Sequence, residues 1–164
     1  MHCKIIELIP DLDKPLCKSK WAKANDLPES FVGDIADYTD DIDEDYAERL
    51  KDAFVEDVGA HCVRDGNWIM FDEDAKKVDA QDRYKEFINA AKTLSEMTFD
   101  EFCGLGDTNM LNHTVWLLGD RYEDKFGLYI YDSSTCDLVP YTAWMRHMEP
   151  GKRYFMGSVM DYHW

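Results

Sequence analysis

Long apolar runs are missing from this sequence. No stretch approaches the about eighteen apolar residues that a membrane-spanning helix needs. The first ten residues, MHCKIIELIP, are interrupted by Lys4 and Glu7, and they lack the apolar core and the small-residue cleavage site of a signal peptide. We therefore expect a protein of the cytoplasm that has no membrane partner.

Cysteine pairs are missing as well. The chain has five cysteines, an odd number, and none of them belongs to a CxxC pair. Cys3 follows His2, but Cys17 lies too far downstream to match the paired spacing of structural zinc sites. We expect reduced thiols, and we expect no disulfide framework, no metal site and no cofactor.

Basic residues are scarce in one stretch, because residues 33–48 contain neither lysine nor arginine. Residues 26–60 hold thirteen acidic side chains against two basic ones, Arg49 and Lys51, which is an excess of eleven negative charges within a net charge of −16. Binding to DNA or RNA requires clustered lysine and arginine that neutralise phosphates. This chain would instead repel phosphates and anionic membranes, which argues against direct binding of nucleic acid.

Catalytic motifs are also absent from the sequence. Nucleophilic catalysis needs a cysteine or serine beside a base. The chain offers three cysteines and three histidines for such a pair, namely Cys62, Cys103, Cys136, His61, His113 and His147. None belongs to a recognisable motif, so we expect no catalytic residues. An enzyme is an alternative only if folding brings a cysteine or carboxylates together with a histidine in a closed pocket.

A calcium loop matches part of the acidic stretch. Asp41, Asp43 and Asp45 occupy the first, third and fifth positions of an EF-hand-like loop. Tyr46 replaces the glycine that the sharp turn needs, and Asp52 replaces the bidentate glutamate. The same residues follow a helical period, so we expect weak divalent binding at most.

The chain does contain enough apolar material for one folded domain. Its 164 residues are 45% hydrophobic and 13% aromatic, a density that disordered chains lack. Strands are expected at residues 3–9, 68–71, 114–118, 128–131 and 154–160, with a hairpin joining 114–118 to 128–131. Helices are expected from residues 26–29 through 38, at 43–58, and from Asp79 or Asp82 onward, and residues 141–148 fit a strand or a short helix. The predicted fold is a single α+β domain over residues 1–164, with a mostly antiparallel sheet and with helices from the N-terminal two thirds packed on it.

The helix at 43–58 lies in an acidic helical segment that we place at residues 26–60. Its apolar residues recur at spacings of three and four and define a buried face, while several acids on its other faces lie about 6 Å apart along the axis. Exposed helices normally intersperse lysine with glutamate, so the two interpretations are a solvated face and an anionic surface that binds a partner. The residues predicted for that surface are Asp37, Asp40, Asp41, Asp43, Glu44, Asp45, Glu48, Asp52 and Glu56.

Closely spaced carboxylates can imitate the phosphate array of a nucleic acid. We therefore expect a non-enzymatic inhibitor that binds a basic nucleic-acid-binding protein or nuclease, with an affinity that falls steeply with salt. Inhibitors encoded by phages and mobile elements, including DNA-mimic antirestriction and anti-CRISPR proteins, act in this way in the host cytoplasm, and this chain is similar to them in size and charge. The alternative is an immunity protein that plugs the active site of a basic nuclease toxin.

Aromatic residues gather near the C-terminal end of the sequence. They are Tyr141, Trp144, Tyr154, Phe155, Tyr162 and Trp164. Such residues usually pack on a sheet. If one face of the last strand is exposed, they would supply interface contacts or a homodimer surface.

Overall fold

The sheet is organised by its longest strand, β7, which pairs with three other strands. The computed structural model describes residues 2–105 and 109–164. Its strands are β1 (His2–Pro10), β2 (Tyr38–Asp41), β3 (Cys62–Asp65), β4 (Trp68–Phe71), β5 (Tyr129–Asp132), β6 (Asp137–Pro140) and β7 (Arg153–His163). β7 runs antiparallel to β1 on one side; on the other side its first residues pair with β4 and its last with β2.

The remaining strands extend this central group in both directions. β3 lies outside β4, and β5 and β6 continue the sheet beyond β1. Among the described strands only β1 and β5 are parallel, and every other pair is antiparallel. The expected α+β domain with a mostly antiparallel sheet is confirmed.

Each face of the sheet is covered by a different part of the chain. The helices are α1 (Phe31–Asp34), α2 (Glu44–Val58), α3 (Ala75–Ser95), α4 (Phe99–Phe102), α5 (Asn109–Glu123) and α6 (Tyr141–His147), with 3-10 turns at Lys18–Lys20, Ala24–Asp26 and Gly59–His61. On one face α2, α6 and the start of α3 bury side chains such as Ile6, Phe54 and Met145. On the other face the connection from β1 to β2 buries Ile5 and Tyr162 together with Phe31.

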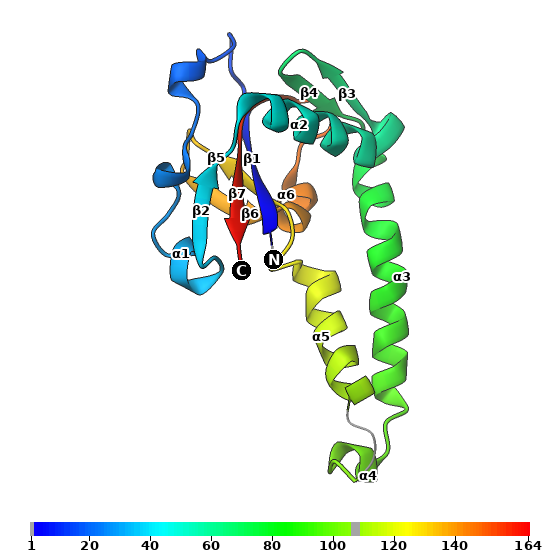
Figure 1. Ribbon diagram of the computed structural model, residues 1–164. Helices are drawn as coiled ribbons and strands as arrows, with labels where there is room; N and C mark the ends of the chain where they lie inside the picture. The colour runs from blue at the N-terminus through cyan, green and yellow to red at the C-terminus, as the bar shows by residue number, and fades with distance from the viewer. Residues whose placement is uncertain (1, 106–108) are drawn as a thin grey trace.

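A helical arm projects from this body (Figure 1). It consists of α3 and the antiparallel α5, and α4 lies at its tip. The 21 residues of α3 span about 31 Å at the rise of an α-helix, so most of the arm lies beyond the sheet. No helix of the described residues is both long and apolar enough to cross a membrane.

The structure corrects three of the expected elements. Residues 114–118 were expected as a strand of a hairpin, but they lie in the middle of α5. Leu111, Thr114 and Leu118 are buried or partly buried at the spacing of one helix side, whereas a strand would alternate its side chains between two faces. The third expected helix, α3, begins earlier than predicted, at Ala75. The expected helix after residues 26–29 is interrupted at Gly33, which has a positive φ of 107°, and residues 38–41 form β2.

Other elements match the expectation. The helix expected at 43–58 is α2, which Asp43 caps by accepting a hydrogen bond from the Tyr46 N–H at 2.9 Å and which ends at Gly59. The first strand, the strand after Gly66-Asn67, and the last two expected strands are all present as β1, β4, β5 and β7. Residues 141–147 form the short helix α6.

Candidate interaction surface

The nine acids predicted for a partner surface lie on two consecutive elements. Asp40 and Asp41 belong to β2, Asp37 directly precedes it, and the other six begin with the α2 cap residue Asp43. Three of the nine therefore belong to a strand region, so the segment expected to be helical over residues 26–60 also contains a strand. β2 leads directly into α2, so the acids remain contiguous along the chain.

Three of these acids are compensated by cations of the same molecule. Glu44 pairs with Lys18. Glu48 binds Lys51 at 2.8 Å and Arg64 at 2.7 Å, and Arg64 also binds Asp52 at 2.5 Å. Arg64 lies on β3, so this network joins α2 to the sheet edge rather than leaving its carboxylates available to a partner.

Lys51 contributes a buried cation to that network. Its side chain is fully buried, and its ammonium lies 4.4 Å from the centroid of the Trp21 ring. Burial lowers the pKa of Lys51, and the hydrogen bond to Glu48 offsets only part of that effect. Partial burial alone would raise the pKa of Glu48, but the hydrogen bonds from Lys51 and Arg64 outweigh it and lower the pKa.

Three further acids are bound without being neutralised. Asp41 accepts a hydrogen bond from the Ala24 N–H at 2.7 Å, and Asp43 caps α2. Asp37 lies 3.2 Å from Nδ1 of His163. A main-chain N–H carries no net charge, and a histidine compensates a carboxylate only when it is protonated. No lysine or arginine of the described residues therefore forms an ion pair with these three acids.

The remaining three acids, Asp40, Asp45 and Glu56, form no ion pair within the described part of the chain. Asp40 lies opposite Asp161 of β7 in the strand register, and Asp161 itself lies 2.6 Å from Nδ1 of His2. Asp45 lies in the first turn of α2, whereas Glu56 lies eleven residues further on, about 16 Å along the helix.

The uncompensated charge is therefore concentrated where β2 meets α2. We call this set the acidic corner; it comprises Asp37, Asp40, Asp41, Asp43 and Asp45. Asp37, Asp40 and Asp41 lie within about 13 Å of chain, a mean interval of about 6.5 Å, whereas one DNA strand carries a phosphate per about 3.4 Å. Asp40 and Asp41 are neighbours on β2 and point to opposite faces of the strand, so the acidic corner presents carboxylates in more than one direction. Its position on an edge strand also protects that edge against pairing with another strand.

The candidate nucleophiles are not paired with bases among the described residues. Cys62 is buried, and this burial raises the pKa of its thiol to about 11, which keeps it protonated and unreactive. His61 lies 3.0 Å from Asp72, whose carboxylate also accepts hydrogen bonds at the start of α3.

The side chains of the described residues form no group of three or more potential metal ligands. In the EF-hand-like match, Asp43 caps α2 and Asp45 lies in its first turn, as the helical period of these residues predicted.

A hollow lies on the other face of the sheet, and two of its lining residues, Ala22 and Ser133, bind the buried carboxylate of Glu7. Lys20, Tyr131, Ser133 and Cys136 are among the residues that line it. Glu7 accepts hydrogen bonds from the N–H groups of Ala22 and Ser158, both at 3.0 Å, and from the Ser133 hydroxyl at 2.5 Å. These donors satisfy the carboxylate, so Glu7 holds the N-terminal connection onto the sheet.

The C-terminal aromatic residues are core residues rather than a binding surface. Tyr154, Phe155 and Tyr162 are all at least 96% buried. Large exposed apolar side chains lie on the arm instead, including Phe99, Phe102, Leu105, Val115, Trp116 and Tyr122. Sequence reasoning missed this surface because it assigned residues 114–118 to the sheet. The apolar residues of α3, including Phe87, Ile88 and Leu94, were the available signal, because such a stripe needs another element to cover it.

Comparison with protein-family models, with curated proteins and with solved structures gave no match.

Proposed function

We propose that this protein is a non-enzymatic inhibitor that binds a basic nucleic-acid-binding protein, such as a nuclease or a defence complex, through the acidic corner. The observation that carries this proposal is the concentration of uncompensated carboxylates at the junction of β2 and α2, where the molecule supplies no lysine or arginine partner to Asp37, Asp40, Asp41, Asp43 or Asp45 among its described residues. Such a protein acts in the cytoplasm, and in the host cytoplasm if a phage encodes it.

The physical basis of this binding is electrostatic. A basic cleft that normally holds phosphates is surrounded by counterions, and binding of closely spaced carboxylates displaces them as DNA or RNA does. Opposite potentials also accelerate the encounter between the two proteins. Because exposed charges are screened by salt, both the association rate and the affinity should fall as salt rises.

Capture of the partner from a cell lysate at low and at high salt tests this function. The variant Asp40→Lys with Asp45→Lys reverses two charges of the acidic corner, and Glu56→Lys with Asp57→Lys is a control that changes the net charge of −16 by the same amount. We expect the wild type and the control to capture the same basic protein at low salt, and the corner variant to bind it roughly ten- to a hundredfold more weakly. Equal capture by both variants would contradict the proposal.

Two further measurements complete this experiment. Reversal of a first-turn acid costs a helix up to about 1 kcal/mol, so thermal unfolding must show that the corner variant is folded. The identity of the captured protein separates the two inhibitor classes, because a nuclease toxin encoded beside this chain indicates an immunity protein and a defence complex indicates a counter-defence factor.

A further inference from the structure

The tip of the helical arm combines exposed apolar side chains with acids. Phe99, Phe102 and Leu105 are 79%, 73% and 77% exposed. Thr98 and Glu101 form a capping box that fixes the start of α4, so these side chains are presented from an ordered turn. Asp100 is exposed beside them. The tip is therefore an apolar, negatively charged end.

The base of the same arm has the complementary character. A hollow of about 280 Å³ lies between α3, α5 and α6. Apolar and aromatic groups line it, including Tyr84, Phe87, Tyr122 and Met145. Four cationic residues border it: Lys76, Arg83, Arg121 and Arg146. This hollow has the size and the lining to accept an aromatic side chain that approaches with a negative charge.

Two of those cations lack a carboxylate partner within the described chain. Lys76 donates to the main-chain carbonyl of Arg146 at 3.1 Å, and Arg146 donates to the main-chain carbonyl of Tyr122. The guanidinium of Arg146 lies 4.3 Å from the centroid of the Tyr122 ring. By contrast, Arg83 pairs with Asp79, and Arg121 pairs with both Glu86 and Asp120. The base thus holds two cations, Lys76 and Arg146, that no carboxylate of the described residues binds.

Exposed apolar side chains also lie on the two helices of the arm. Val115 and Tyr122 are seven residues apart on α5, which places them on one side of that helix, and they are 55% and 56% exposed. Tyr84 on α3 is 65% exposed, and Phe87 contacts Tyr122 with ring centroids 6.2 Å apart. Both helices of the arm therefore carry exposed apolar side chains, which together we call the apolar face of the arm.

We propose that a second copy of this chain covers this face, with the two arms packed antiparallel into a four-helix bundle. In that arrangement the apolar, acidic tip of each arm enters the apolar, cationic base of the other. A two-fold dimer requires such self-complementarity, because the same patch must contact itself in the opposite sense. The tip and the base lie at opposite ends of the arm, so one antiparallel pairing satisfies both at once.

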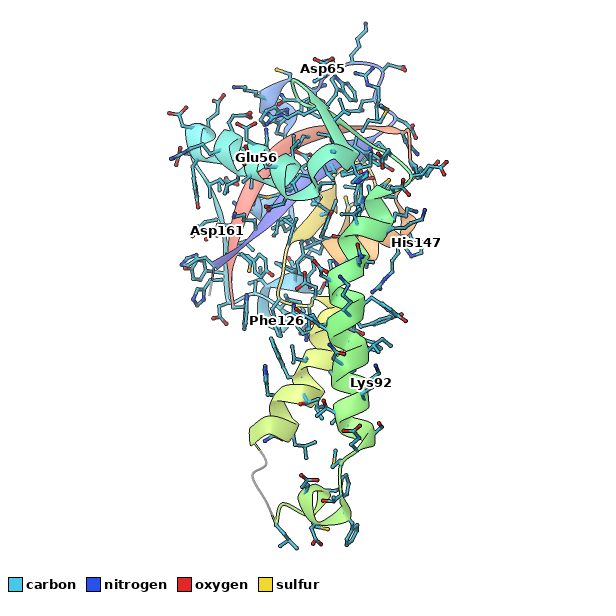
Figure 2. All side chains as sticks on the ribbon, turned by 90° about the vertical axis from the view of Figure 1, so that its right-hand side faces the viewer. Glu56, Asp65, Lys92, Phe126, His147 and Asp161 are labelled. Atoms are coloured by element: carbon cyan, nitrogen blue, oxygen red, sulfur yellow. The ribbon has the colours of Figure 1, made fainter. Side chains whose placement is uncertain are left out.

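The charge distribution favours a second copy as the occupant. The acidic corner lies on β2 and at the start of α2, both of which belong to the body (Figure 1). The arm extends away from the body, as the position of Lys92 on α3 shows (Figure 2). Antiparallel arms place the two bodies at opposite ends of the dimer, which keeps the two acidic corners apart. Repulsion between corners therefore does not oppose this contact, and both corners stay accessible to partners.

The oligomeric state of the full chain tests the proposal. Sedimentation equilibrium should show a dimer, and Phe99→Ser with Phe102→Ser should weaken dimerisation by on the order of a hundredfold or more, because each dimer loses four buried rings. Val63→Ser, which truncates a 59% exposed side chain on β3, is the matched control and should leave the dimer intact. A monomer at all concentrations, or a dimer that the tip changes do not affect, would overturn the proposal.

A crosslinking experiment tests the antiparallel order itself. Cys103 at the tip and Gln81 at the base are separated within one chain by fourteen residues of α3, about 21 Å, before the tip begins. In a Cys17→Ser, Cys136→Ser background, Gln81→Cys and a bismaleimide shorter than that span should give covalent dimers joined between residues 103 and 81. Crosslinks only between two copies of Cys103 would show that the tips meet each other, and would overturn the antiparallel arrangement.

Discussion

Arg64 on β3 donates a hydrogen bond to the carboxylate of Glu48 on α2 at 2.7 Å, with the arginine side chain 17% exposed. The same guanidinium binds Asp52. One arginine thus ties two acids of the helix to the edge of the sheet. Acids that form ion pairs within the chain, such as Glu48 and Asp52, are not expected to bind a partner. We expect the partner to bind the acids that form no such pair.

Removal of this arginine should destabilise the fold without weakening partner binding. Arg64→Met leaves Glu48 and Asp52 without their shared donor, and we expect a loss of about 1 to 3 kcal/mol in the free energy of unfolding. Urea denaturation measures this. The control is Arg49→Met, because Arg49 is exposed and stacks on Tyr46, so its removal should cost less than about 0.5 kcal/mol. Equal effects of the two changes would contradict the role given to Arg64.

The buried ammonium of Lys51 should be replaceable. Lys51→Met removes the cost of burying a charge, while Glu48 keeps Arg64 and remains 42% exposed, so stability near neutral pH should stay within about 1 kcal/mol of the wild type or increase. A loss above about 2 kcal/mol would show instead that the contact of the ammonium with Trp21 dominates.

The pH dependence of Lys51 has a definite sign. Burial lowers the pKa of Lys51 in the folded state, so in the alkaline range the unfolded chain binds more protons at this residue. The wild type should therefore gain stability relative to Lys51→Met as the pH rises through the folded pKa toward the usual value of 10.5. Paired urea titrations at about pH 7 and about pH 10 measure this difference, and a difference that does not change with pH would contradict it.

Gly157 should be intolerant of any side chain. A Cβ at this position would lie 2.0 Å from Oε2 of Glu7 and 2.6 Å from its Cδ. Glu7 is fully buried and hydrogen-bonded to three residues, so it has no free direction in which to move. We expect Gly157→Ala to cost about 2 to 4 kcal/mol of unfolding free energy.

Gly119 in α5 is the matched control for that substitution. A Cβ there would meet nothing within 4 Å. Because alanine is the better helix former, Gly119→Ala should stabilise the protein by about 0.5 to 1 kcal/mol. Thermal unfolding of both variants checks the pair, and a neutral Gly157→Ala variant would show that Glu7 is held less firmly than its hydrogen bonds indicate.

Local signals were sufficient to predict α2 but not α5. Asp43 and Gly59 mark the two ends of α2, and its apolar spacing is helical. In α5, residues 114–118 include β-branched and aromatic side chains that favour a strand when considered alone. Only the packing of α5 against α3 overrides that preference, and the sequence does not state which segments pack together.

The sequence identified the acids of the candidate surface but not the cations of the same chain that bind some of them. The acids were identified from their charge, yet Arg64 is sixteen residues from Glu48 and reaches it only because β3 lies beside α2. Asp40 and Asp41 were expected between two helices of the acidic segment, and they lie on β2 because β7 offers that strand a free edge. Tertiary pairing therefore decided which acids remain uncompensated.

Competition with nucleic acid is the most direct test of the proposed inhibitor. The affinity of the captured partner for DNA or RNA should be measured as the concentration of this protein rises. We predict that the apparent Kd for the nucleic acid increases equally with the wild type and with Glu56→Lys, Asp57→Lys, and that Asp40→Lys, Asp45→Lys needs a roughly ten- to hundredfold higher concentration for the same increase. A stable ternary complex with nucleic acid, or equal inhibition by the Asp40→Lys, Asp45→Lys variant, would contradict the account.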